Sequence, residues 1–309
     1  MSNGQTYFFY GILLFVQVLF GLNFSASKIV VGAIDPTHWA FFRFFVAGLI
    51  LLVTSAILFR GKGEWNLKYF FKILLLSFWG VALSQGAFMH GIYLTSSINT
   101  AIICSLIPVF TLLIVIIKGQ ERLTWKRGVG FSLALLGVVV IRKFEQLSFS
   151  NTTFIGDLLI LASVVGTSVF ISYGRGFLQQ HNHWWASAWL FLFGSMQLLF
   201  LALLEGSAVK LPELANSPLV ISMCYTVIGA TLLTYFLSNW ALVHVDSGKV
   251  SLFIYLQPVV ASMVAWGYLG ESVTIRSLLS CGLILMGFLL GLGGSRRQKR
   301  DNYEVNSTV

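Results

Sequence analysis

The sequence predicts an all-α membrane protein in which ten transmembrane helices form two inverted repeats of five, with both termini in the cytoplasm. Three observations lead to this prediction. Hydrophobic residues make up 57% of the 309-residue chain and charged residues only 10%. Apolar runs of membrane-spanning length recur along the chain. The two halves of the chain also share a residue pattern, as inverted-repeat membrane proteins do.

The apolar runs define the expected helices. The hydrocarbon core of a bilayer is about 30 Å thick and takes about 20 helical residues to cross. Ten runs approach or exceed that length. They are residues 8–31, 38–59, 70–94, 98–117 and 128–141 in the first half, then 156–174, 184–204, 218–243, 248–268 and 275–292 in the second.

The links between these runs are short and polar, so no separate soluble domain is expected. The chain divides into a first five-helix repeat at residues 1–145, a second at 146–294 and a basic cytoplasmic tail at 295–309. The first run is longer than the core of a signal peptide and no basic residue precedes it, so it is expected to remain as the first helix. The three cysteines lie singly in apolar runs, which indicates neither a disulfide framework nor a zinc site.

The distribution of basic residues predicts the orientation. The net charge of +9 is typical of some nucleic-acid-binding proteins, but in a membrane chain Lys and Arg mark the loops that stay in the cytoplasm. With the N-terminus inside, fourteen Lys and Arg residues fall on the cytoplasmic side and four on the other, while Lys28 and Arg43 fall within helices. The expected partner of these basic residues is therefore the lipid bilayer, and no nucleic-acid partner is expected.

An internal repeat links the two halves. A shift of 150 positions superposes Ser97, Leu106, Pro108, Val109, Glu121, Thr124, Leu133, Leu135 and Gly137 on Ser247, Leu256, Pro258, Val259, Glu271, Thr274, Leu283, Leu285 and Gly287. Nearer the start of each half, a shift of 145 superposes Gly11, Leu13, Leu14, Gly21, His38 and Trp39 on Gly156, Leu158, Leu159, Gly166, His183 and Trp184. Because five helices per repeat is an odd number, the second repeat enters the membrane from the opposite side. Such inverted repeats are typical of carriers that work by alternating access, although duplication alone could also enlarge a bundle.

With these features the chain resembles the drug/metabolite transporter superfamily, and within it the ten-helix EamA-type carriers. The resemblance covers nearly the whole length. It is carried by the motifs Gly21-Leu22-Asn23-Phe24 with Lys28, the spacing from Pro36 to Arg43, the Pro108 and Pro258 helices, and the turns Gly119-Gln120-Glu121-Arg122-Leu123-Thr124 and Gly270-Glu271-Ser272-Val273-Thr274. It implies export or exchange of small metabolites, amino acids or drugs, by a multi-pass protein of a bacterial inner membrane.

Polar and aromatic side chains at membrane depth are the candidate substrate-binding residues, because hydrocarbon satisfies no polar group. They are Asn23, Lys28, Gln85, His90, Tyr93, Tyr173, Tyr235, Asn239, Trp240 and Gln257. Lys28 either faces the cavity or extends to water, and His90 either carries a proton, pairs with substrate or packs as a neutral group. Mixed amide and aromatic groups suit an amphipathic, amino-acid-like substrate.

Five further residues are expected to act in structure or gating. Pro108 and Pro258 each remove a backbone hydrogen bond from the middle of a helix and so bend it. Glu121 and Glu271 lie at helix ends, where a carboxylate favours the positive end of the next helix. The resemblance makes Arg43 a structural anchor, and the alternative is that Arg43 faces the cavity.

Several features are missing from the sequence. No Asp or Glu lies in the middle third of an apolar run, so a carboxylate proton relay is not indicated, and a neutral or zwitterionic substrate suits the cavity better than a permanent cation. No P-loop or zinc-protease motif is present, so neither cofactor nor metal is expected. An importing permease of the same fold remains the main alternative, and an intramembrane enzyme a remote one. The sequence carries no signal for an oligomeric state.

Overall fold

The computed structural model describes residues 3–59, 67–95, 100, 103–120, 123–141, 151–206, 217–260, 263 and 275–293. Within these ranges the regular structure is entirely helical, and ten helical segments coincide with the ten apolar runs. This confirms the all-α prediction and the number of helices. The calls at Glu121, at Glu271 and in the tail at residues 295–309 fall outside the described residues.

Two of the ten segments are compound helices in which an α-helix changes to a π-helix and back. The first half contains α1 (Asn3–Val31), α2 (Pro36–Phe59), the compound helix of α3 (Leu67–Ser77), η1 (Phe78–Leu83) and α4 (Ser84–Leu94), then α6 (Ile107–Ile117) and α7 (Trp125–Ile141). The second half contains α8 (Asn151–Gln180), α9 (His183–Glu205), the compound helix of α10 (Ser217–Cys224), η3 (Tyr225–Leu233) and α11 (Thr234–His244), then α12 (Ser247–Leu252), η4 (Phe253–Tyr255) and α14 (Ile275–Gly293).

Six of the helices in the described part are long and apolar enough to cross a membrane. They are Gly4–Val31, Pro36–Phe59, Leu67–Leu94, Thr152–Gln180, His183–Leu204 and Pro218–His244. The expected run at 98–117 differs, because α6 has only 11 residues and is about 16 Å long at 1.5 Å per residue. That is about half the thickness of the hydrocarbon core.

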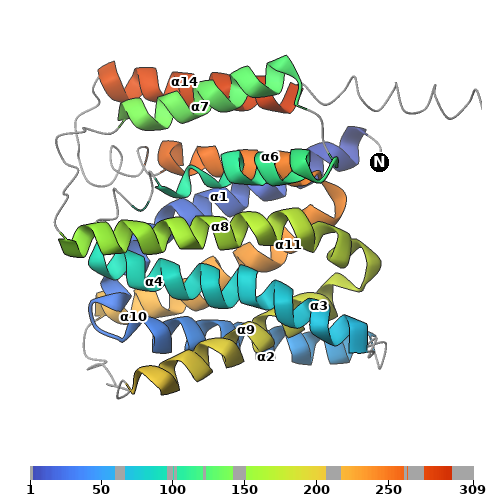
Figure 1. Ribbon diagram of the computed structural model, residues 1–309, viewed down its shortest axis with the longest axis vertical. Coiled ribbons are helices and arrows are strands. Elements are labelled where there is room, and N and C mark those ends of the chain that lie inside the picture. The colour runs from blue at the N-terminus through green and yellow to red at the C-terminus, as the bar shows by residue number, and fades with distance from the viewer. Residues whose placement is uncertain are drawn as a thin grey trace, which may run out of the picture.

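The helices pair in a reciprocal way between the two halves. Figure 1 shows α7 beside α14 at the top and α2 beside α9 at the bottom, and these are the two most extensive contacts that join the halves through corresponding helices. Between them, α4 packs on α8 while α1 packs on η3 and α11. Each half therefore offers the same helices to the other, as a pseudo-two-fold relation between repeats requires.

Glycines allow the closest of these contacts. A Cβ added to Gly287 on α14 would lie 2.4 Å from the backbone nitrogen of Ala134 and 2.5 Å from the carbonyl oxygen of Gly130, both on α7. One added to Gly137 would lie 2.8 Å from Ile284. Gly137 and Gly287 are a matched pair of the sequence repeat, so the repeat glycines are the residues that let α7 and α14 touch backbone to backbone.

The π-helical segments η1 and η3 occupy corresponding positions in the two halves and are absent from the sequence-based prediction. A π turn adds a residue to the helix and so changes the direction of every side chain that follows. Gly80 and Gly229 lie within the two segments. A Cβ on Gly80 would lie 2.6 Å from the ring of Phe170 on α8, so this segment is seated directly against a helix of the other half.

Of the two repeat prolines, Pro108 lies at a helix start instead of in mid-helix as expected. Pro108 lies in the first turn of α6, where backbone N–H groups have no acceptor within the helix, so the N–H that proline lacks is not missed. Pro258 follows the short 3-10 helix η4, near the start of the helical residues 256–260. Pro108 therefore begins a helical segment after a turn, whereas Pro258 lies within residues 247–260, which are helical throughout with the 3-10 turn η4 in their middle.

Candidate functional site

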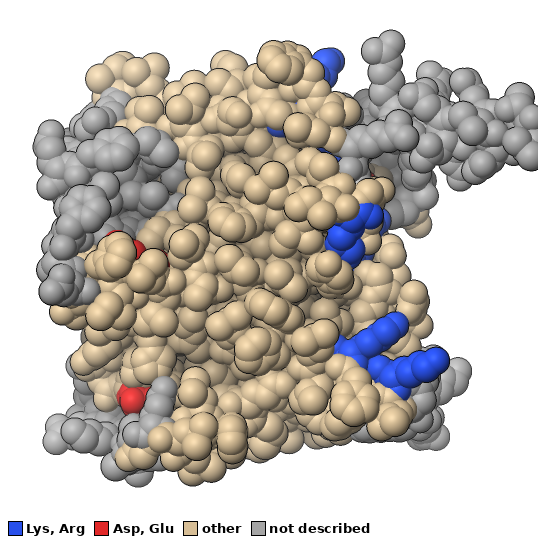
Figure 2. All heavy atoms as spheres, viewed as in Figure 1, with Lys and Arg blue, Asp and Glu red and all other residues tan. Residues whose placement is uncertain are grey.

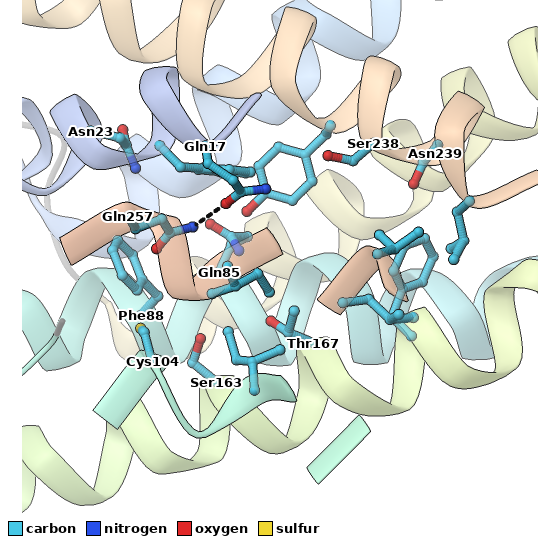
Figure 3. Close-up of a pocket in the computed structure, with 18 of the residues that line it drawn as sticks. Gln17, Asn23, Gln85, Phe88, Cys104, Ser163, Thr167, Ser238, Asn239 and Gln257 are labelled. Atoms are coloured by element: carbon cyan, nitrogen blue, oxygen red, sulfur yellow. Dashed lines mark hydrogen bonds between the residues drawn. The ribbon is translucent and has the colours of Figure 1, made fainter. Parts of the chain in front are cut away.

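A cavity lies between the two halves, with an empty volume of about 890 Å³ including the space that opens to solvent. Figure 3 shows its polar side chains converging from several helices. Its lining consists of Gln17, Phe20, Asn23 and Phe24 on α1, Gln85 and Phe88 on α4, Cys104 and Ile107 before and at the start of α6, Ser163, Thr167, Phe170 and Ile171 on α8, Tyr235, Ser238, Asn239 and Leu242 on α11, and Val250, Ile254 and Gln257 in the segment after it. None of these residues comes from the outer pairs α2–α9 and α7–α14.

Amide side chains form the polar part of this central pocket. The Gln257 amide nitrogen donates to the Gln17 side-chain oxygen at 2.8 Å, which ties α1 of the first half to the second half across the pocket. The Ser27 hydroxyl donates to Asn23 at 3.0 Å, and Asn239 donates to the Ser187 hydroxyl at 3.1 Å. Gln17, Asn23, Asn239 and Gln257 are thus buried and hydrogen-bonded, and all four line the pocket.

A second polar chain runs from the pocket wall into α2. Arg43 donates through Nη2 to the Gln85 side-chain oxygen. Gln85 in turn donates to the Ser84 hydroxyl at 3.0 Å, and Ser84 shares a hydrogen bond of 2.7 Å with Thr167 on α8. Gln85 and Thr167 line the pocket, whereas Arg43 lies behind them and is fully buried.

Aromatic rings form the apolar part of the lining. Phe20 packs edge-on against Tyr235 with 5.3 Å between ring centroids, and Phe24 lies 6.1 Å from Phe88. Phe170 adds a fifth ring from α8. Flat apolar surfaces beside a few amides suit a ligand with one hydrophobic body and one polar group.

Five of the ten predicted binding residues line the pocket, and five lie elsewhere. Those in the pocket are Asn23, Gln85, Tyr235, Asn239 and Gln257. Tyr93 and Tyr173 are about half exposed, at 52% and 51%. The ammonium of Lys118 lies 3.5 Å above the ring of Tyr173.

Lys28 contacts a helix end instead of the pocket. Its ammonium donates to the carbonyl oxygens of Ile92 at 2.5 Å, Tyr93 at 3.1 Å and Thr95 at 2.8 Å. The last carbonyls of a helix have no intrahelical donors and carry partial negative charge, so a Lys is well placed there. Lys28 thus ties α1 to the C-terminal end of α4.

His90 and Trp240 contact residues outside the pocket. His90 Nε2 lies 2.5 Å from the Thr37 hydroxyl on α2. Trp240 lies 5.4 Å from Phe9 on α1 and stacks on His183 at 6.2 Å. Both contacts lie away from the pocket lining.

Polar contacts join neighbouring segments near each end of α8. Asp157 near the start of α8 accepts a hydrogen bond of 2.6 Å from Thr95. Arg175 near its end forms an ion pair of 2.8 Å with Asp246, just before α12. These positions are 18 residues apart, or about 27 Å along a helix, and the pocket residues of α8 lie between them.

Asp35, in the link before α2, has a lowered pKa. Partial burial acts to raise this pKa, but hydrogen bonds from the backbone and ring of His38 and from the Thr37 amide outweigh it. The carboxylate therefore stays ionised at the start of α2, where the positive end of the helix also favours it.

Several lining residues are absent from the sequence-based prediction, notably Ser163, Thr167 and Ser238. The spacings of four and three residues between Ser163, Thr167 and Phe170 place these side chains on one face of a helix. Their recurrence was available as a signal, but small hydroxyl residues are so common in membrane helices that the spacing alone does not stand out. Among the described residues, no group of three or more His, Cys, Asp or Glu side chains could hold a metal ion.

Ten helices in two matched sets around a shared central pocket are the architecture of a membrane carrier. The sequence profile of the EamA-like transporter family matches residues 8–143 and again residues 154–292. The chain therefore belongs to the EamA-like transporter family, within the drug/metabolite transporter superfamily, which confirms the resemblance noted from its motifs.

Individual relatives agree with this assignment. An "Uncharacterized transporter" of Archaeoglobus fulgidus is 28% identical over 281 residues, covering 90% of this chain and 96% of its own. The "Uncharacterized transporter YyaM" of Bacillus subtilis is 24% identical over 306 residues, covering 96% and 98%. A solved crystal structure aligns with a TM-score of 0.76 at 16% identity over 96% of this chain and 99% of that one, which shows a shared fold.

Proposed function

We propose that this chain is a secondary transporter that exports or exchanges small amphipathic metabolites, such as amino-acid-like compounds, or drugs, by alternating access. The observation that carries the proposal is the central pocket, which both halves line and which the Gln17–Gln257 hydrogen bond spans. Binding sites of carriers built from repeats lie at the interface between the repeats.

The contacts at the two ends of α8 support alternating access. The Thr95–Asp157 hydrogen bond lies near one end of α8 and the Arg175–Asp246 ion pair near the other, and in this proposal each contact acts as a gate. The Arg175 and Asp246 side chains are partly exposed, so their ion pair costs little to break, whereas Thr95 is buried. Opening one set while the other stays closed would expose the pocket to one side of the membrane at a time.

The proposed topology has inverted repeats and both termini in the cytoplasm of a bacterial cell, with the protein in the inner membrane. The fourteen-to-four distribution of Lys and Arg supports this orientation. On the face seen in Figure 2, basic side chains gather toward the right edge, where Figure 1 places the N-terminus, and acidic ones lie at the left edge. An odd number of helices per repeat then requires the inversion.

Export is favoured over import by the resemblance alone, and an importing permease of this fold is the second candidate. The transporter relatives argue against an enzyme. Counterflow in proteoliposomes with known orientation, loaded in turn with amino acids, neutral metabolites and cationic drugs, separates these functions. Absence of counterflow for every class would contradict the proposed function.

Cysteine accessibility tests the site itself. Ser238 lines the pocket, whereas Leu233 on the same compound helix is 41% exposed on the bundle surface. With the natural cysteines replaced by serine, Ser238→Cys should react with a small polar thiol reagent and be protected by a transported substrate. The matched Leu233→Cys variant should face lipid and react poorly. Equal labelling of both variants, with no protection, would rule out this pocket.

A further inference from the structure

We propose that Arg43 makes the central pocket selective for substrates that carry a carboxylate. This inference deepens the proposed function and rests on it, because it names the class of compound that the same pocket accepts. The resemblance assigns Arg43 to structure, but its surroundings leave its charge available to a ligand.

Arg43 is a fully buried cation with unused donors. It lies on α2 with 0% of its surface exposed. Nη2 donates to Gln85, but Nε and Nη1 are buried without a hydrogen-bond partner in the described structure. The guanidinium carbon also lies 5.1 Å from the centroid of the Phe44 ring. A neutral amide and a ring compensate a buried charge only in part, and an uncompensated one costs several kcal/mol.

No acidic side chain in the described part of the protein neutralises this charge. Asp35 lies in the link before α2, eight residues before Arg43 in sequence, and is held by His38 and Thr37. Asp157 accepts from Thr95 and Asp246 pairs with Arg175, both at helix ends. Arg43 is thus a positive charge at membrane depth for which the described residues supply no anion.

Gln85 connects this charge to the pocket. Its oxygen accepts from Arg43, and the same side chain lines the pocket and points into the space that Gln17 and Gln257 share (Figure 3). A ligand carboxylate that displaced the Gln85 oxygen would receive the guanidinium N–H groups and complete the ion pair. Guanidinium N–H groups bind a carboxylate better than an amide because the bond is charge-assisted and can be bidentate.

The rest of the lining supplies no second formal charge to a ligand. Phe20, Phe24 and Phe88 offer apolar surface, and Asn239 and Gln257 offer neutral hydrogen bonds. The fitting class is a small organic acid with an aromatic or aliphatic body. An amine of the same shape would meet a like charge in a medium of low dielectric constant and should be rejected.

Three probes that share a phenylpropyl skeleton test the inference. They are the anionic 3-phenylpropionate, the neutral 3-phenylpropionamide and the cationic 3-phenylpropylamine. Binding to the purified full chain in nanodiscs is measured by the change in intrinsic tryptophan fluorescence. The acid should bind roughly tenfold or more tightly than the amide, the effect of one hydrogen bond to a charged group, and the amine should bind most weakly. Equal binding of the acid and the amide, or no binding of the acid, would overturn the inference.

Three variants assign the effect to Arg43. Gln85→Glu supplies a resident carboxylate and should abolish the preference for the acid without lowering the unfolding temperature. Arg43→Gln should abolish it too, and the exchange Arg43→Gln with Gln85→Arg should restore it. If Gln85→Glu leaves the acid-to-amide ratio unchanged, or if a folded exchange variant fails to restore it, Arg43 has only a structural role. Gln85→Glu keeps the test decisive if the Arg43 variants do not fold.

Counterflow separates this inference from the proposed function. If the wild-type chain binds the acid selectively but no probe or metabolite undergoes counterflow, the transport proposal fails and the charge assignment stands. If the neutral or cationic probe is carried better than the acid, the charge assignment fails and transport stands.

Discussion

Gly287 and Gly282, both on α14, form a matched pair for testing the contact between the outer helices. A Cβ at Gly287 would lie 2.4 Å from the Ala134 backbone nitrogen and 2.5 Å from the Gly130 carbonyl oxygen, whereas one at Gly282 has nothing within 4 Å. Ordinary contact begins near 3.4 Å, so Gly287→Ala forces α7 and α14 apart by about 1 Å, and backbone atoms cannot turn aside as a flexible side chain can.

Overpacking of this kind costs about 1–3 kcal/mol. Both substitutions gain the same helix propensity, about 1 kcal/mol, so the difference between the two variants isolates the steric term. At about 2–4 °C per kcal/mol, Gly287→Ala should unfold roughly 5 °C below Gly282→Ala. Unfolding in detergent, followed by tryptophan fluorescence and by the loss of the monodisperse peak in gel filtration, provides the measurement. Equal unfolding temperatures for the two variants would refute the backbone contact.

Three further predictions concern the ends of the pocket and its lining. Lys28→Met should lower the free energy of unfolding by about 1–2 kcal/mol, because carbonyl oxygens at the end of α4 lose their donor, while Lys28→Arg should keep most of that stability. Chemical denaturation of both variants measures the loss. An equal loss in both would show that the hydrogen bonds are unimportant. With the other two cysteines changed to serine, Cys104 should be alkylated slowly by a small maleimide and more slowly still with bound substrate, and mass spectrometry that finds no protection would place it outside the transport path. Arg175 and Asp246 are 28% and 38% exposed, so a double-mutant cycle to alanine should give a coupling energy under about 1 kcal/mol, and a coupling several times larger would mean that this end is not easily opened.

The helices and the duplication could be predicted from the sequence because both depend on composition and spacing. A run such as residues 218–243 is apolar over its full length, so its helix requires no knowledge of its neighbours. The matched glycines Gly137 and Gly287 likewise survive in sequence because nothing larger fits between α7 and α14.

The direction in which individual side chains point was harder to predict from the sequence, because it depends on helix register and on partners distant in sequence. Lys28 reads as an intramembrane charge, yet its acceptors at Ile92 and Thr95 are 64 and 67 residues away. The π segment η1 changes the helical phase just before Gln85, so a regular 3.6-residue period fails at that point. Polar residues at membrane depth indicated where the pocket lies, and only the packing determines which of them face it.

The contact of Gly130 with Gly287 also bears on how the two halves could move. Interlocking side chains between two helices resist rotation of one helix against the other, whereas α7 and α14 contact each other here through backbone atoms. The two helices lie alongside each other, with a second close approach between Gly137 and Ile284, so we expect them to move together as one unit. Because this pair lies at one edge of the bundle and α2 with α9 at the other, and neither pair lines the pocket, opening the pocket would require movement of the helices between them.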